Sequence, residues 1–258
     1  MKKIIYLLSL TITVSLYSCA PKLLPKAEAY KSFYEEKPVA ILVMPPINRT
    51  TNVDAKEYFH TTLSMPMNNA GYYVIPPFLS MEILKRESAY DAEMFLNAPL
   101  TKFGNVFGAD LALFTIINKW QKASLLGTVT VEVEYIFKSI KTNEIVYQRT
   151  GNITINANSN SGGGGLGALV GMAVAAIKTA TTDYAVVGSV CNNVTLQDLP
   201  AGPYSPSHNK DGDQKAGQKD FKTSVNGDAK SLQKETAKWY SRFAKDKNNN
   251  KDKNKEKY

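Results

Sequence analysis

Three runs of apolar residues stand out in the first half of the chain, bounded by prolines or polar residues. They read "VAILVM" from residue 39, "GYYVI" from residue 71 and "LALFTIINKW" from residue 111. A short apolar run without alternation is typical of a strand that is covered on both faces of a sheet. We therefore expect three buried strands in this part of the chain.

The segments between these runs have helical spacing. Residues 52–71 carry apolar side chains near a 3.6-residue period, although Pro66 predicts a kink or an early end. Residues 80–98 form a second amphipathic pattern. A shorter segment begins at Pro99 and ends at Gly108, which is the order expected at the two ends of a helix.

The pattern changes after residue 127. The stretch "TVTVEVEYIF" alternates valine and aromatic residues with threonine and glutamate, which is the period of a strand with one buried and one solvated face. "KTNE" at 141–144 predicts a turn, and residues 145–159 predict a second, less regular antiparallel strand. The order β-α-β-α-α-β-β-β-α predicts an α/β fold, with a mixed β-sheet that is flanked by helices and extended at one edge by an antiparallel hairpin.

The amino terminus, "MKKIIYLLSLTITVSLYSCA", has two lysines followed by a mostly apolar segment without charge. It predicts a secretory signal peptide, because spanning a bilayer takes about 20 apolar residues. The segment ends in Leu16-Tyr17-Ser18-Cys19, which is the pattern of a bacterial lipobox. Cleavage before Cys19 would leave its thiol to carry a diacylglycerol and to anchor the protein to a membrane.

These signals divide the chain into four parts. Ala20 is not the aspartate that favours retention in the inner membrane, so we expect a lipid-anchored protein of the outer membrane that faces the periplasm. The expected parts are a signal peptide at 1–18, a lipidated tether at 19–36, an α/β domain at 37–204 and a basic, disordered tail at 205–258.

The expected tail carries most of the chain's net charge of +8 and is rich in Lys, Asp, Asn and Gly. This composition is typical of a solvated, disordered segment. An alternative is a weak electrostatic tether to anionic lipid, polysaccharide or peptidoglycan. Residues 231–245, "SLQKETAKWYSRFAK", have the spacing of a short amphipathic helix.

A glycine run, "SGGGGLGALVGMAVAAIKTA", occupies residues 161–180. It is not a P-loop, because no Gly-Lys-[Ser/Thr] follows, and it lacks the context of a dinucleotide fingerprint. Small residues recur every four positions, at Gly163, Gly167, Gly171 and Ala175, so a helix over 162–179 would have one smooth face for close packing. Two interpretations stay open, namely a helix packed flush on the sheet and a helix for self-association or membrane contact.

Few residues suggest chemistry. His60 lies on a predicted helix and His208 lies in the expected tail, and neither has metal-ligand spacing, so we expect no metal and no cofactor. Glu132 and Glu134 share one face of a strand and are predicted to be solvated. Cys191 has no partner once Cys19 is acylated, and is predicted to be a small buried residue. We expect no catalytic residues, with an envelope hydrolase as the weakest alternative.

Several blocks in order resemble a family of bacterial lipoproteins of unknown function, of the neisserial genome-derived antigen type. They are "VAILVMPPINRTTNVDAKEYFHTTL", "AGYYVIPP", "FGADLALFTIINKW", "TVTVEVEYIFKS" and "LPAGPYSP". The resemblance covers about residues 19–206. It implies a fold similar to the amino-terminal domain of TolB, no established catalytic residues, and an accessory or assembly role beside a CsgG-like outer-membrane lipoprotein.

The first hypothesis is therefore a non-enzymatic binding or assembly subunit of an envelope complex, held by a lipid on Cys19. Its expected partners are the membrane and envelope proteins, a CsgG-like secretion pore among them, and we expect no nucleic-acid partner. The alternative is an oligomeric, membrane-active protein that assembles through the glycine-rich helix at 162–179.

Overall fold

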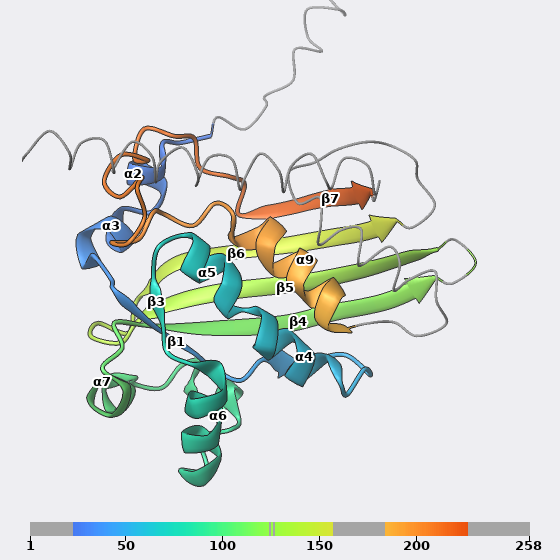
Figure 1. Ribbon diagram of the computed structural model, residues 1–258, viewed down its shortest axis with the longest axis horizontal. Helices are drawn as coiled ribbons and strands as arrows, with labels where there is room; N and C mark the ends of the chain where they lie inside the picture. The colour runs from blue at the N-terminus through green and yellow to red at the C-terminus, as the bar shows by residue number, and fades with distance from the viewer. Residues whose placement is uncertain (1–22, 124, 126, 157–183, 227–258) are drawn as a thin grey trace, which may run out of the picture.

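The computed structural model describes residues 23–123, 125, 127–156 and 184–226. They form one mixed sheet with helices on both faces (Figure 1). The strand order is β3-β1-β4-β5-β6-β7, and β2 also pairs with β4. The strands are β1 (Ala40–Val43), β2 (Ile47–Asn48), β3 (Tyr73–Val74), β4 (Leu111–Ala123), β5 (Thr128–Ser139), β6 (Ile145–Asn156) and β7 (Asp220–Asn226).

The sheet combines two kinds of pairing. The short strands β1, β2 and β3 pair in parallel with each other or with β4, whereas β4, β5 and β6 form a long antiparallel meander. At the other edge β7 runs parallel to β6. The predicted mixed α/β sheet with an antiparallel hairpin is confirmed.

Helices cover the two faces unequally (Figure 1). Helices α4, α5 and α9 lie over one face of the long strands, where α4 packs against α9, while α6 and α7 cover the parallel end on the other side. The helices are α2 (Lys26–Ala29), α3 (Lys31–Glu36), α4 (Ala55–Thr62), α5 (Ser64–Asn69), α6 (Pro77–Arg86), the 3-10 turn η1 (Ala92–Phe95), α7 (Thr101–Phe107) and α9 (Tyr184–Leu196). Among the residues that the structure describes, no helix has the length and apolar character to cross a bilayer.

Strand β5 shows why its sequence alternates. Its side chains on one face belong to the larger core and are fully buried. On the opposite face Glu132 accepts a hydrogen bond from Asn152 at 2.8 Å, and Glu134 accepts one from Gln148 at 2.5 Å. The buried residues are Val129, Val131, Val133, Tyr135 and Phe137.

Two apolar clusters lie on opposite sides of the sheet. The larger one joins β4, β5 and β6 to α3, α4, α5 and α9, and the smaller one joins β1 and β4 to α6, η1 and α7. The runs in β1 and β4 supply both clusters: Ile41 and Val43 face the larger one, and Leu42 and Met44 face the smaller one. This two-sided burial is why these runs do not alternate.

Helix α9 lies close to the sheet. At Gly151 on β6, an added Cβ would sit 2.5 Å from Thr195 Oγ1, so only a residue without a side chain lets the helix approach this closely. Asn192 forms a polar link across the interface, because it accepts a hydrogen bond from the Tyr135 hydroxyl and donates one to Thr62 Oγ1 at 2.9 Å. The buried hydroxyl and amide thus satisfy each other.

Several predicted helices have different ends in the structure. The helix expected over 52–71 is divided between α4 and α5 at Leu63, upstream of Pro66. The helix expected over 80–98 begins earlier, at Pro77, and ends at Arg86. The short helix predicted to end at Gly108 does so, with that glycine at φ +64°.

The expected domain boundaries were wrong at both ends. Residues 26–36, assigned to the tether, form α2 and α3, and Phe33 is buried in the larger core. Residues 205–226, assigned to a disordered tail, are ordered and end in β7. Pairing with β6 orders this polar segment, and its own sequence carries little apolar signal for a strand.

The predicted burial of Cys191 is confirmed, because its side chain on α9 is fully buried. This burial raises the pKa of the thiol. Because the thiolate is the reactive form, we expect a thiol reagent to leave native Cys191 unmodified and to titrate it only after denaturation. If Cys19 is acylated, the denatured mature protein will show one reactive thiol. Fast labelling of Cys191 in the native protein would contradict the burial.

Candidate functional site

A buried polar cluster joins the first helix to the end of the described chain. Lys26 Nζ lies 3.9 Å from Asp198 Oδ1 and 3.7 Å from Asp211 Oδ2. The side chains of Lys26, Asp198 and Asp211 are 9%, 8% and 4% exposed. Buried charges of this kind are stable only when they are paired, so one lysine on α2 is held by two carboxylates from a distant segment.

Two tyrosines from the same amino-terminal helices complete this cluster. The Tyr30 hydroxyl donates a hydrogen bond to Asp198 Oδ2, and the Tyr34 hydroxyl donates one to Asp211 Oδ1 at 3.0 Å. Burial, and then the bond to each aspartate, raise the pKa of both hydroxyls above the ordinary tyrosine value. We call the five residues Lys26, Tyr30, Tyr34, Asp198 and Asp211 the clasp.

Backbone groups bring the two aspartates into the clasp. Gly217 N donates to Asp198 Oδ2 and Ala201 N donates to Asp211 Oδ2, both at 2.8 Å. Gly217 also makes room for Arg149, because an added Cβ there would lie 2.4 Å from a terminal nitrogen of that guanidinium. A side chain at this position would therefore require the Arg149 guanidinium to move from its place in the structure.

Arg149 supports the clasp from β6. Its Nη1 donates to Thr195 O at 2.8 Å and its Nε donates to Gln218 O at 3.1 Å. Its guanidinium lies 4.4 Å from the centroid of the Phe221 ring, and Phe221 is the second residue of β7 to pair with β6. One buried arginine thus holds the end of α9 and the start of β7.

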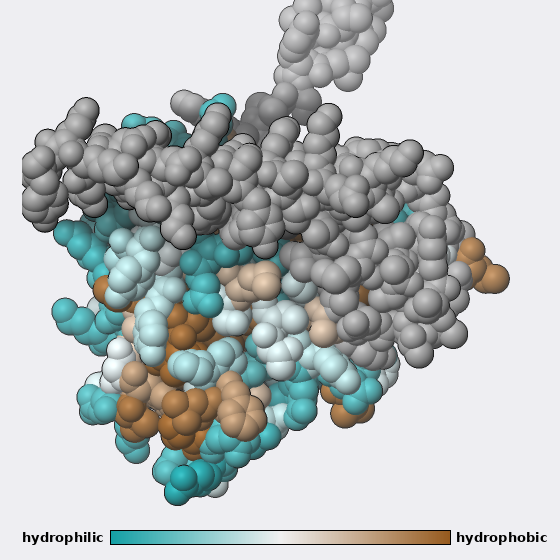
Figure 2. Space-filling model, in the orientation of Figure 1, coloured by the Kyte–Doolittle hydropathy of each residue, from teal (hydrophilic) through white to brown (hydrophobic). Residues whose placement is uncertain are grey.

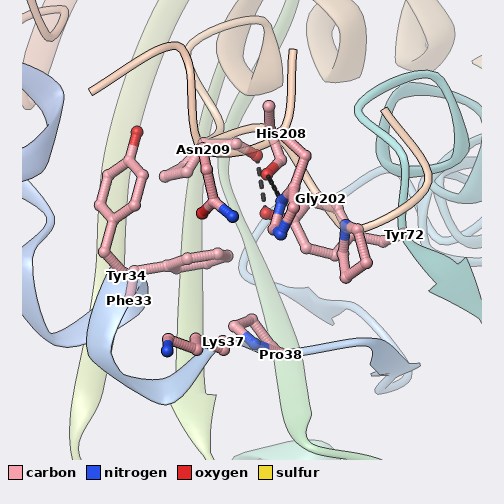
Figure 3. Close-up of a pocket in the computed structure, with 11 residues that line it drawn as sticks. Phe33, Tyr34, Lys37, Pro38, Tyr72, Gly202, His208 and Asn209 are labelled. Carbon is pink, nitrogen blue, oxygen red and sulfur yellow. Dashed lines mark hydrogen bonds between the residues drawn. The ribbon is translucent and has the colours of Figure 1, made fainter. Parts of the chain in front are cut away.

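A small cleft lies beside the clasp, between α3 and residues 200–209 (Figure 3). His208 Nδ1 lies 3.0 Å from Ala201 O, and Tyr72 donates to Pro200 O at 2.7 Å. The cavity holds about 20 Å³, which is room for about one water molecule and not for a cofactor. Figure 3 shows its labelled lining, Phe33, Tyr34, Lys37, Pro38, Tyr72, Gly202, His208 and Asn209.

A larger, open hollow of about 650 Å³ lies between α3, α7 and the β5–β6 turn, and carries several carboxylates. Asp110 accepts two backbone hydrogen bonds at the start of β1, at 2.8 and 2.9 Å, and Glu36 accepts one from Ser139 at 2.8 Å. These acids therefore hold the fold together. In the described part of the chain, no three His, Cys, Asp or Glu side chains are grouped to hold a metal ion.

An apolar surface lies at the opposite side of the molecule from the clasp. Figure 2 shows apolar side chains gathered over α6, at the lower margin of Figure 1, whereas α2 lies at the upper margin. Exposed side chains on α6 are Phe78 at 81% and Leu79 at 54%, and the nearby elements α5 and β3 add Met65 and Tyr73. Large exposed apolar side chains grouped on ordered elements are typical of an interaction surface. We call these four residues the apolar patch.

The structure does not test the site residues predicted from the sequence. Cys19 and the small-residue face of Gly163, Gly167, Gly171 and Ala175 lie outside the described residues. The clasp was missed. A signal for part of it is present, since Tyr30, Phe33 and Tyr34 follow a helical period, but no local pattern indicates that Asp198 and Asp211 face Lys26.

The mixed sheet with an apolar cluster on each face and the docked amino-terminal helices define an α/β domain. The chain belongs to the family described as "Putative lipoprotein GNA1162-like", which matches residues 28–201. The matched region begins within α2, so it includes most of residues 26–36, which the sequence analysis assigned to the tether.

One relative by sequence and two solved structures are similar to this chain. The chain is 29% identical over 179 residues to "Putative lipoprotein NMB1124/NMB1162" of Neisseria meningitidis serogroup B, covering 69% of this chain and 82% of that protein. It is similar to the crystal structure of lipoprotein GNA1162 from Neisseria meningitidis, with a TM-score of 0.44 and 24% identity over 54% of this chain and 95% of that one. The PelC dodecamer from Paraburkholderia phytofirmans gives a TM-score of 0.34 and 12% identity over 62% and 84%.

The clasp makes a testable contribution to stability. Lys26→Met would leave two buried aspartates without their cation, so we expect the free energy of unfolding to fall by about 3–5 kcal/mol in urea titrations. The control is Lys31→Met on the neighbouring helix, whose pair with Glu35 is 76% and 65% exposed. That exposed pair is expected to contribute less than about 1 kcal/mol. Equal effects of the two substitutions would contradict a stabilising clasp.

The burial of His60 predicts that the free energy of unfolding depends on pH. It is 3% exposed on α4, and burial lowers its pKa to about 4. Because the unfolded chain then binds a proton first, near pH 6.5, the free energy of unfolding should fall as pH drops from about 6.5 towards 4, by up to roughly 3 kcal/mol. His60→Gln cannot titrate, so we expect a flatter profile in this window. Identical slopes between pH 6.5 and 5 would show that folding does not lower the pKa of His60.

Proposed function

We propose that this protein is a non-enzymatic binding or assembly subunit of a bacterial envelope complex. A lipid on Cys19 holds it on the periplasmic face of the outer membrane. The membership in a lipoprotein family and the lipobox at Leu16-Tyr17-Ser18-Cys19 support the anchor, and Ala20 supports the outer membrane. Its partner is another envelope protein, with a CsgG-like secretion lipoprotein as the first candidate.

The observation that carries this proposal is the apolar patch. Phe78 and Leu79 occupy the first turn of α6, which Pro77 begins, so the two side chains are held on an ordered helix. Leu84, farther along the same helix, is buried in the smaller core and fixes the helix on the sheet. A rigid helix with large apolar side chains turned outward suits a protein partner that covers them, and burial of such a side chain contributes about 1.5–3 kcal/mol.

The position of the apolar patch supports a protein, and not the anchoring membrane, as the partner that covers it. Helix α2 and residues 198–216, through which the anchored segment joins the domain, lie at the other side of the molecule (Figure 1). The clasp holds them there. A protein that is held at one side and apolar at the other can connect a membrane to a second component, which is the task of an assembly subunit.

Site-specific photocrosslinking in intact cells tests this function. We expect a photoreactive residue at Leu79 to capture an envelope protein, and one at the exposed polar Gln121 on β4 to capture much less of it. Phe78→Ser should reduce the capture from Leu79 with little loss of stability, because Phe78 is 81% exposed.

The matched control is Val106→Ser on α7, which removes a side chain that is 61% exposed and lies outside the apolar patch. It should leave the capture unchanged. Absence of any specific product from Leu79, or equal capture from Leu79 and Gln121, would overturn the assembly role at this surface.

A further inference from the structure

The segment between the lipid and the folded domain is much shorter than the sequence suggests. Leu24 O accepts a hydrogen bond from Ala216 N at 2.8 Å, Lys26 N donates to Gln214 O at 2.7 Å, and Pro25 forms a bridge with Lys215. The chain is therefore paired with the domain from Leu24 onward. Leu24 follows Cys19 by five positions, and five extended residues span at most about 18 Å.

The clasp decides this length. Without it, the free segment would continue to the start of β1, and about 20 extended residues would span up to about 70 Å. With it, Lys26, Tyr30 and Tyr34 keep α2 and α3 on the two aspartates. A connection of about 18 Å is too short to reach around a domain whose sheet contains strands of 12 and 13 residues, each roughly 40 Å long.

The surface around this attachment suits a lipid interface. Leu23 and Leu24 are 36% and 43% exposed, next to the exposed Lys210 and Lys215. Apolar side chains beside lysines are found where a protein contacts lipid headgroups, because the methylenes are buried while the ammonium groups stay in the polar layer. Asp211, which would repel an anionic surface, is buried and paired with Lys26, so the exposed charges of residues 210–216 are Lys210, Asp213 and Lys215, with a net of +1.

We infer that the side of the domain formed by residues 23–27 and 210–216 lies against the bilayer surface, and that the domain has a preferred orientation which turns the apolar patch away from the membrane. This inference rests on the proposed acylation of Cys19. On this inference, the clasp shortens the connection between the lipid and the domain. The short connection then restricts which side of the domain can face lipid.

Fluorescence quenching on vesicles tests the orientation. The full-length mature lipoprotein is purified as Gln214→Cys or as Leu79→Cys, labelled with a thiol-reactive fluorophore, and bound to vesicles of phosphatidylethanolamine and phosphatidylglycerol that carry a nitroxide on the headgroup. Gln214 is exposed at the attachment side and Leu79 at the patch, so neither label disturbs the core. Buried Cys191 contributes only the background of the unsubstituted protein.

We expect the headgroup nitroxide to quench the label at position 214 several-fold more than the label at position 79. Equal quenching at both positions would show that the domain tumbles on its anchor, and stronger quenching at position 79 would show that the patch contacts lipid; either result overturns the inference. Flotation of the protein with the vesicles and the mass of its amino-terminal peptide are recorded first. A protein that neither floats nor carries acyl chains refutes the lipid anchor itself, whereas an acylated protein with equal quenching refutes only the orientation.

Discussion

The pairing of Lys26 with Asp198 and Asp211 is the interaction on which the arrangement of this molecule depends. One positive and two negative charges are buried together, and tyrosine hydroxyls and backbone N–H groups donate hydrogen bonds to the two carboxylates. The stability of such a cluster depends on every member, because removing one charge leaves the opposite charges buried without a partner. It therefore ties the beginning of the described chain to a segment more than 170 residues later, and fixes this amino-terminal end on one side of the domain.

The way the helices cover the sheet explains why the apolar patch on the side opposite the clasp is exposed. Strands β1 and β4 are buried on both faces, so their runs are continuously apolar, whereas β5 and β6 are covered mainly on the side of α9. Helix α6 closes the second face only at the parallel end, and it uses Leu84 to do so. Its first turn is then left pointing outward with Phe78 and Leu79, and a helix that is fixed by its inner face presents its outer face without further ordering.

Much of the fold could be predicted from the sequence, because local patterns report burial directly. The alternation of 128–137 and the apolar runs at 39–44 and 111–120 each match a strand in the structure. The clasp could not be predicted in the same way. Lys26 and Asp211 look like solvated surface charges in a polar context, and charge carries no periodic signal of which distant residue will face it. Strand β7 was missed for a related reason, since its partner β6 and the arginine under Phe221 order it, and its own composition does not.

The sequence by itself determined the α/β class and the two-faced character of β5, and it predicts a secretion signal and a cysteine for acylation, since each of these depends on a short stretch of residues. The tertiary structure alone decided that residues 26–36 and 205–226 pack on the sheet, and which apolar side chains stay uncovered. Those properties depend on contacts between residues far apart in the chain, and such contacts form only when folding brings the two ends of the domain together.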